Sequence, residues 1–196
     1  MPSAETRAAQ KERTRTELTE RRRSYAQAQL EAFAEQLATV VLDVPEVQDA
    51  DTVGCYVGVD EEPGTLALLD ALKEAGKTVL VPITNPDMTL DWAEYTGPDD
   101  LAEARFGLLE PVTSRLGTAA IKAANVVLLP ATAVDATGVR LGRGGGCYDR
   151  VLAMLPDSVV TCALLYPDEV LDELPTEPHD KKVQLAATPA GVVRFD

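Results

Sequence analysis

The sequence contains few of the residues that build disulfide frameworks and metal clusters. Its 196 residues include three cysteines and one histidine. The cysteines, Cys55, Cys147 and Cys162, are odd in number and lack metal-ligand spacing. Free thiols in a reducing cytosol therefore fit this chain better than a set of disulfides. We expect a cytoplasmic protein.

Long apolar runs and an excess of basic charge are also missing. No apolar run approaches the length needed to span a bilayer, and the first residues, Met-Pro-Ser-Ala-Glu-Thr-Arg, lack an apolar signal core. The 18 basic residues stand against 32 acidic ones, and the net charge of −14 argues against non-specific nucleic-acid binding. We expect neither a membrane nor a nucleic acid as a partner, and no obligate protein partner is evident.

What the chain does contain is an ordinary globular mixture, with 45% hydrophobic and 26% charged residues. A strand over residues 52–57, a helix from the N-cap Thr65 to Gly76 and a strand over 78–82 predict a right-handed parallel crossover. There is no repeat or linker, so residues 1–196 are predicted to form a single α/β domain.

The remaining elements are predicted from apolar periodicity. Leu30, Phe33 and Leu37 recur at the spacing of one buried helix face. The pattern predicts a helix over residues 3–42 with a break near 18–19, strands over 88–93, 125–130, 159–165 and 183–187, an extended segment over 105–111, and a helix from about 149.

Basic side chains are concentrated in two places on this acidic chain. Residues 1–23 hold seven basic residues against four acidic ones, and a glycine-rich loop further on holds the second group. Lys11 and Arg15 lie four residues apart and so share a helix face. An anion between them would explain two like charges on one face, whereas a solvated basic face is the alternative.

The glycine-rich loop follows a predicted strand and precedes a predicted helix, within the segment 135–150. Five glycines lie between Gly138 and Gly146. Glycine lets backbone N–H groups approach an anion, and a helix N-terminus offers further donors. Arg140, Arg143 and Arg150 add positive charge, and Asp149 adds an oxygen ligand suited to Mg²⁺. The loop is thus predicted to bind phosphate, with a flexible surface loop as the alternative.

Three further side chains are candidates for contact with a ligand. Glu62 lies in a loop at the carboxyl end of a predicted parallel strand, where ligands collect in such sheets, although a carboxylate beside a helix dipole is the alternative. Trp92 and Phe106 could stack on a flat ring, and core packing is the alternative for either.

Five motifs in a fixed order resemble those of the 5-formyltetrahydrofolate cyclo-ligase family, also called methenyltetrahydrofolate synthetases. They cover nearly the whole chain: Lys11-Glu-Arg-Thr-Arg15, Tyr56 to Thr65 with Glu62-Pro-Gly-Thr65, Phe106-Gly-Leu-Leu-Glu-Pro111, Gly138 to Arg150, and Ala163-Leu-Leu-Tyr166 followed by Pro178-His-Asp180. The resemblance implies a three-layer α/β fold with a mainly parallel central sheet flanked by helices.

The resemblance also implies an enzyme that converts 5-formyltetrahydrofolate to 5,10-methenyltetrahydrofolate with ATP and Mg²⁺, giving ADP and phosphate. The N5-formyl oxygen would be phosphorylated, and N10 would then attack the formyl carbon. No protein nucleophile is required, and His179 is predicted to be a turn residue rather than a general base. By position, Arg143 and Tyr148 would be catalytic, and Asp149 and Asp180 would hold Mg²⁺.

The same resemblance assigns the binding of the two substrates. ATP would bind Lys11, Arg15, Arg140, Leu141, Gly142, Arg143, Gly144, Gly145, Gly146, Cys147 and Tyr148. The folate would bind Val57, Glu62, Arg143, Gly144, Gly145, Gly146 and Cys147.

Two residues depart from the family pattern and keep other functions open. Cys147 stands where the family usually has the first of two adjacent tyrosines, and Gly145 stands where some members have lysine. A relative that binds ATP or a folate with altered or no cyclo-ligase activity is therefore one alternative. A regulatory nucleotide-binding module, whose basic N-terminal helix docks a partner, is the other.

Overall fold

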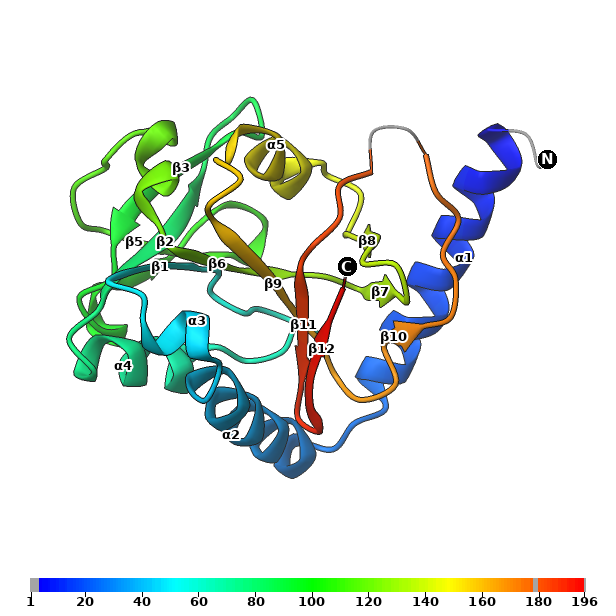
Figure 1. The fold of residues 1–196 in the computed structure, drawn as a ribbon, viewed down its shortest axis with the longest axis horizontal. Coiled ribbons are helices and arrows are strands. Elements are labelled where there is room, and N and C mark those ends of the chain that lie inside the picture. The colour runs from blue at the N-terminus through cyan, green and yellow to red at the C-terminus, as the bar shows by residue number, and fades with distance from the viewer. Residues whose placement is uncertain (1–3, 178–179, 196) are drawn as a thin grey trace.

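The computed structural model describes residues 4–177 and 180–195, so His179 lies outside the described residues. Helices and strands alternate along much of the chain (Figure 1). The elements are α1 (Ala4–Arg23), α2 (Gln27–Leu42), α3 (Pro45–Gln48), β1 (Thr52–Cys55), α4 (Leu66–Glu74), β2 (Thr78–Thr84), β3 (Leu90–Glu94), η1 (Pro98–Asp100), β4 (Leu101–Glu103), η2 (Arg105–Gly107), β5 (Leu109–Pro111), η3 (Thr118–Ala123), β6 (Val126–Pro130), β7 (Ala133–Asp135), β8 (Arg140–Leu141), α5 (Cys147–Met154), β9 (Val160–Leu164), β10 (Val170–Leu171), β11 (Leu185–Thr188) and β12 (Gly191–Arg194).

The central sheet has the strand order β12-β11-β9-β6-β1-β2-β3. Its five inner strands are parallel to their neighbours, whereas β3 and β12 at the two edges are antiparallel. Helix α4 connects the parallel neighbours β1 and β2, which confirms the predicted crossover. The strands β10, β7 and β8 form a second sheet, and β4 pairs with β5 in a hairpin.

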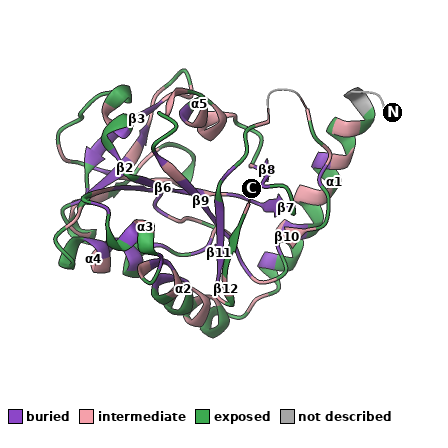
Figure 2. Ribbon diagram, viewed as in Figure 1, coloured by how far each residue is buried: buried purple, intermediate pink, exposed green. Residues whose placement is uncertain are grey.

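Two hydrophobic cores cover the two faces of the central sheet, which makes the three layers predicted from the family resemblance. On one face, α2 and α4 pack Leu37, Val41 and Leu69 against the strands. On the other face, η3 and α5 contribute Ile121 and Val151. Figure 1 shows α2, α3 and α4 below the sheet and α5 above it, and Figure 2 shows buried residues running through the strands between these layers.

The N-terminal helical region differs from its prediction. The chain leaves the helix at residues 24–26 rather than near 18–19, and α1 and α2 point in different directions (Figure 1). Arg22, near the end of α1, is buried and pairs with the fully buried Glu169 through two hydrogen bonds of 2.7 Å. This contact fixes α1 beside β10 and not along α2, so the break follows a tertiary contact that periodicity cannot reveal.

Other boundaries shift by a few residues, and the loop over 135–150 contains more structure than predicted. The short strand β8 lies within it and pairs with β7, and α5 begins at Cys147 rather than near 149. Thr65 precedes α4 as expected, but its hydroxyl forms no helix cap. It donates to the Tyr56 carbonyl at 2.8 Å and accepts from the Gly58 N–H at 2.9 Å instead.

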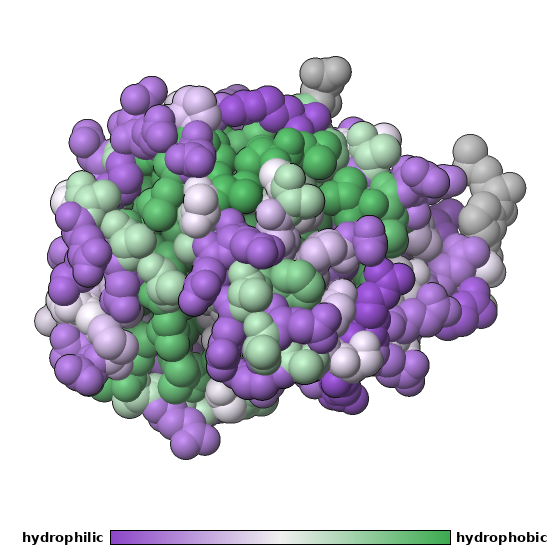
Figure 3. Space-filling view, turned by 90° about the horizontal axis from the view of Figure 1, so that it is seen from below, coloured by the Kyte–Doolittle hydropathy of each residue, from purple (hydrophilic) through white to green (hydrophobic). Residues whose placement is uncertain are grey.

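Among the described residues, no helix is both long and apolar enough to cross a membrane. Hydrophobic and hydrophilic residues both reach the surface seen from below in Figure 3. Few large hydrophobic side chains are exposed, and the most exposed are Phe106 and Val112, each at 65%. Phe106 is considered below because it belongs to a cavity.

Candidate functional site

A cavity of about 550 Å³ lies at the carboxyl ends of the parallel strands. Its wall includes Val57 after β1, Thr84 at the end of β2, and Pro130 at the end of β6. Ligands collect at this edge of parallel sheets because loops and helix N-termini converge there. The location therefore agrees with the prediction that Glu62, which also lines the cavity, lies among ligand-binding groups.

Every residue that the family resemblance assigns to a substrate or metal lines this one cavity. The set comprises Lys11, Arg15, Val57, Glu62, Arg140, Leu141, Gly142, Arg143, Gly144, Gly145, Gly146, Cys147, Tyr148, Asp149 and Asp180. The first and last of these positions are 169 apart in the sequence, and the fold brings them to one place. The individual roles of these residues remain predictions.

The glycine-rich loop reaches the cavity as a left-handed turn held by a buried arginine. Gly144 and Gly146 have φ values of 97° and 69°, which favour glycine, and α5 begins directly after Gly146. The Arg140 guanidinium donates to the Pro130 carbonyl at 3.1 Å and to an Asp149 carboxylate oxygen at 2.6 Å. Arg140 therefore fixes the loop between β6 and α5.

Helix α1 presents its predicted basic face to the same loop. Arg15 Nε donates to the Gly142 carbonyl at 2.8 Å, and Lys11 Nζ lies 2.7 Å from both a Glu177 and an Asp180 carboxylate oxygen. Burial lowers the pKa of Lys11, but its hydrogen bonds to the two carboxylates outweigh this effect and raise the pKa overall. Lys11 is thus held as a cation at the cavity wall.

The two carboxylates assigned to Mg²⁺ both line the cavity, and each is paired with a cation of the chain. Asp149 is bound to Arg140 and Asp180 to Lys11. No group of three or more His, Cys, Asp or Glu side chains suited to a metal occurs among the described residues. Mg²⁺ is often held by one or two carboxylates together with substrate phosphates, so two carboxylates suffice for that ion.

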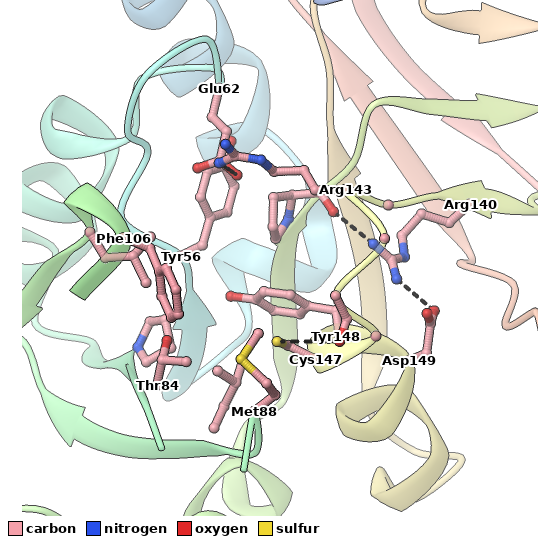
Figure 4. Close-up of a pocket in the computed structure, with 18 of the residues that line it drawn as sticks. Tyr56, Glu62, Thr84, Met88, Phe106, Arg140, Arg143, Cys147, Tyr148 and Asp149 are labelled. Carbon is pink, nitrogen blue, oxygen red and sulfur yellow. Dashed lines mark hydrogen bonds and ion pairs between the residues drawn. The ribbon is translucent and has the colours of Figure 1, made fainter. Parts of the chain in front are cut away.

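Glu62 and Arg143 face each other across the cavity (Figure 4). Arg143 Nη1 lies 3.2 Å from Glu62 Oε1, and Glu62 Oε2 accepts a hydrogen bond from the Val59 N–H at 3.3 Å. The Glu62 side chain is 10% exposed and that of Arg143 is 52% exposed. Burial raises the pKa of the Glu62 carboxyl, while the Arg143 charge opposes this shift.

Tyr148 also lines the cavity, and its side chain is seen in Figure 4. Its hydroxyl is buried and has no hydrogen-bond partner within the described part of the chain. Burial raises the pKa of this phenol well above 10.0, so it stays protonated and can donate a hydrogen bond. A buried donor without a partner is costly, and a bound ligand with an acceptor oxygen would satisfy it.

Several cavity residues were missed by sequence reasoning, and of the two aromatic candidates only Phe106 lines the cavity. Trp92 is fully buried in the hydrophobic core, which confirms the alternative of core packing, and it does not line the cavity. Phe106 does line the cavity and has a φ of 63°, which is strained for an aromatic residue. Thr84 and Glu110 were missed: the Thr84 N–H donates to Glu110 at 2.8 Å and so joins the β4–β5 hairpin to β2.

Glu110 belongs to the motif Phe106 to Pro111 of the family resemblance, which gave it no role in the site. Met88, which also lines the cavity, has a φ of 65° in the turn between β2 and β3. Nothing in the local sequence marks Met88 or Thr84 as site residues, because their place depends on how β2 and β3 pair.

The fold and cavity together define an α/β protein with a cavity at the carboxyl edge of its sheet that Lys11, Arg15, Arg140 and Arg143 help to line. Residues 7–189 match the 5-formyltetrahydrofolate cyclo-ligase family, and the chain belongs to this family. A 5-formyltetrahydrofolate cyclo-ligase of Mycolicibacterium smegmatis is 41% identical over 93% of this chain and 96% of its own. One of Escherichia coli is 29% identical over 89% and 98%.

A solved structure shows the same fold. It is 5,10-methenyltetrahydrofolate synthetase of Aquifex aeolicus, which has a TM-score of 0.81 and 22% identity over 94% of this chain and 92% of its own. At this level of identity the likeness concerns the fold, and it agrees with the three-layer architecture described above.

Proposed function

We propose that this chain converts 5-formyltetrahydrofolate to 5,10-methenyltetrahydrofolate with ATP, giving ADP and phosphate. One observation carries the proposal: the glycine-rich loop with its arginines and the buried Glu62 line the same cavity. This arrangement supports a triphosphate site and a site for a flat ring with hydrogen-bond donors next to each other. The family match over residues 7–189 supports a single working domain, and the three free thiols support a cytoplasmic location.

The chemistry requires charge neutralisation and alignment rather than a covalent enzyme intermediate. The γ-phosphoryl group would pass from ATP to the N5-formyl oxygen, releasing ADP. N10 would then attack the formyl carbon and lose its proton, and phosphate would leave with the former formyl oxygen. Lys11, Arg15 and Arg143 supply positive charge toward the phosphates, and the backbone over 142–146 supplies N–H donors.

On the folate side, Glu62 would accept hydrogen bonds from the pterin ring and Phe106 would cover a face of the flat ring system. The protonated Tyr148 hydroxyl would donate to an oxygen of the reacting groups, because it has no partner within the described part of the protein. Arg143, which belongs to the glycine-rich loop and contacts Glu62, would stabilise the phosphoryl group in transit.

Mg²⁺ fits the donor set, since hard cations take carboxylate oxygens and Asp149 and Asp180 both line the cavity. When bound, the ion would neutralise phosphate charge. The cations now paired with these carboxylates, Arg140 and Lys11, would then be available to the phosphates.

The proposal is tested by incubating the purified protein with 5-formyltetrahydrofolate, ATP and Mg²⁺ and following the near-ultraviolet absorbance of the methenyl product. Product that forms with ATP and not without it supports cyclo-ligase activity. Binding of ATP without any product would favour the alternative of a family member with altered activity, for which Cys147 in the cavity wall is the specific observation.

A further inference from the structure

The ion pair between Arg143 and Glu62 joins two groups that the proposed function assigns to different substrates. Arg143 Nη1 is 3.2 Å from Glu62 Oε1, and Arg143 Nη2 is 3.5 Å from the exposed Asp60. Glu62 Oε2 is occupied by the Val59 N–H. Arg143 thus binds the Glu62 oxygen that makes no hydrogen bond to the Val59 N–H.

While Arg143 and Glu62 are bound to each other, Arg143 cannot bind a phosphate fully and Glu62 cannot bind the folate ring fully. An arginine that turns toward a phosphate gives up its contact with Glu62 Oε1, and that oxygen then becomes available to ring N–H donors. The exchange is sterically easy for Arg143, because its side chain is half exposed and its backbone lies between two glycines, Gly142 and Gly144.

The cost of breaking the pair falls on Glu62. Its side chain is 10% exposed, so an unpaired carboxylate there has little water to solvate it. Burial already raises the pKa of this group in the presence of Arg143. Hydrogen-bond donors of the folate ring would remove this penalty. The folate should therefore bind more tightly once the nucleotide has drawn Arg143 away from Glu62.

We propose that the Arg143–Glu62 pair is an exchangeable contact that couples the two substrates: a nucleotide triphosphate draws Arg143 from Glu62, and Glu62 then binds the folate ring more tightly. This inference rests on the proposed function and adds a coupling between its two sites. Because such coupling is reciprocal, the folate must raise nucleotide affinity by the same factor. The expected factor is about fivefold or more, within the usual range for coupled sites.

The decisive experiment measures the affinity for a non-hydrolysable ATP analogue with Mg²⁺ by calorimetry, in the absence of folate. In Glu62→Gln the side chain keeps its shape, but Arg143 loses its pairing with the buried carboxylate and keeps only the longer contact with the exposed Asp60. The analogue should therefore bind about fivefold more tightly than to the wild type. Glu61→Gln is the matched control: it removes the same charge one residue away, and Glu61 pairs with Arg23 and not with Arg143.

Tighter binding in Glu62→Gln with little change in Glu61→Gln supports the coupling. An equal rise in analogue affinity in both variants would show that the effect comes from net charge alone, and it would overturn the proposal. Unchanged analogue affinity in Glu62→Gln would overturn it as well. Wild-type protein gives an independent measure: its affinity for 5-formyltetrahydrofolate should rise by the same factor when the analogue is present. Product formation by the wild type without such a rise would leave the proposed function intact and remove the coupling.

Discussion

Arg15 donates a hydrogen bond from Nε to the backbone carbonyl of Gly142 at 2.8 Å, across 127 residues of sequence. This contact joins α1 to the glycine-rich loop and makes the two basic regions of an acidic chain one surface. The net charge of −14 would repel ATP, and this local concentration of cations offsets the repulsion.

Arg15→Ala should therefore weaken ATP binding by about tenfold, which corresponds to the loss of one hydrogen bond with a charged partner. Titration with a non-hydrolysable ATP analogue measures the effect. Arg13→Ala is a suitable control, because Arg13 lies on the same helix but does not line this cavity. Unchanged nucleotide affinity in Arg15→Ala would favour the alternative in which the basic helix docks a protein partner.

A second prediction concerns the buried pair that positions α1. Arg22 and Glu169 have side chains 5% and 0% exposed, and Glu169 also accepts the Tyr166 N–H at 2.8 Å. Glu169→Gln leaves the Arg22 charge buried without a counter-charge, so the free energy of unfolding should fall by about 3–5 kcal/mol. Chemical denaturation measures this change.

The exposed pair of Arg23 with Glu61 provides the comparison. Arg23→Ala should change the stability far less than Glu169→Gln, because water solvates an exposed carboxylate when its partner is removed. Similar losses of unfolding free energy in the two variants would show that burial of the Arg22–Glu169 pair does not increase its contribution to stability.

The sequence was sufficient to predict the parts of this molecule that depend on local pattern. The parallel crossover from β1 through α4 to β2, the face shared by Lys11 and Arg15, and the glycine-rich loop all follow from residue spacing. The Arg22–Glu169 pair does not, because 147 residues separate its members and neither position has a local signal. The break between α1 and α2 follows from that pair and was misplaced for the same reason.

In the candidate site, too, the sequence indicated which residues take part but not which of them contact each other. Family resemblance named the residues that line the cavity, but it could not show that Arg143 binds Glu62 or that Lys11 binds Asp180. For Trp92 the sequence left both stacking and core packing open, because an alternating strand has two faces, and only the pairing of β3 with β2 decides that Trp92 faces the core.

A third prediction uses the pH dependence of folate binding. Burial raises the pKa of Glu62 above its ordinary value of 4.5, and protonation removes the charge that would bind ring N–H donors. As the pH falls through this raised pKa, the affinity for 5-formyltetrahydrofolate should decrease, and the decrease should begin above pH 4.5. In Glu62→Gln the affinity should be lower and should lack this pH dependence, as fluorescence titration can determine.

A substitution of Phe106 can remove the aromatic ring without adding strain to the backbone, so it tests the role of the ring in ligand binding. Asparagine tolerates the left-handed conformation better than phenylalanine, so Phe106→Asn should retain the stability of the protein although an aromatic ring is lost. Folate affinity should fall by about five- to tenfold if the ring stacks on the substrate. Leu116→Asn alters another exposed hydrophobic residue, outside the cavity, and should leave folate affinity unchanged.

Cys147 is one of the two positions, with Gly145, at which the glycine-rich loop departs from the family pattern. The thiol lines the cavity, and burial raises its pKa, so it stays neutral and forms only weak hydrogen bonds. A phenol there would add a ring and a stronger donor. Cys147→Tyr should therefore raise turnover by about two- to tenfold, the range for one uncharged hydrogen bond.

Turnover at saturating ATP and folate is the relevant measurement, since the backbone that binds phosphate is unchanged and ATP affinity should be as well. Cys147→Ser separates the two contributions of tyrosine, because it supplies a hydroxyl without the ring and should give no comparable gain. If Cys147→Tyr turns over at the wild-type rate, the thiol does not handicap the site. Other residues that line the cavity of about 550 Å³ would then make up for the tyrosine that is missing at position 147.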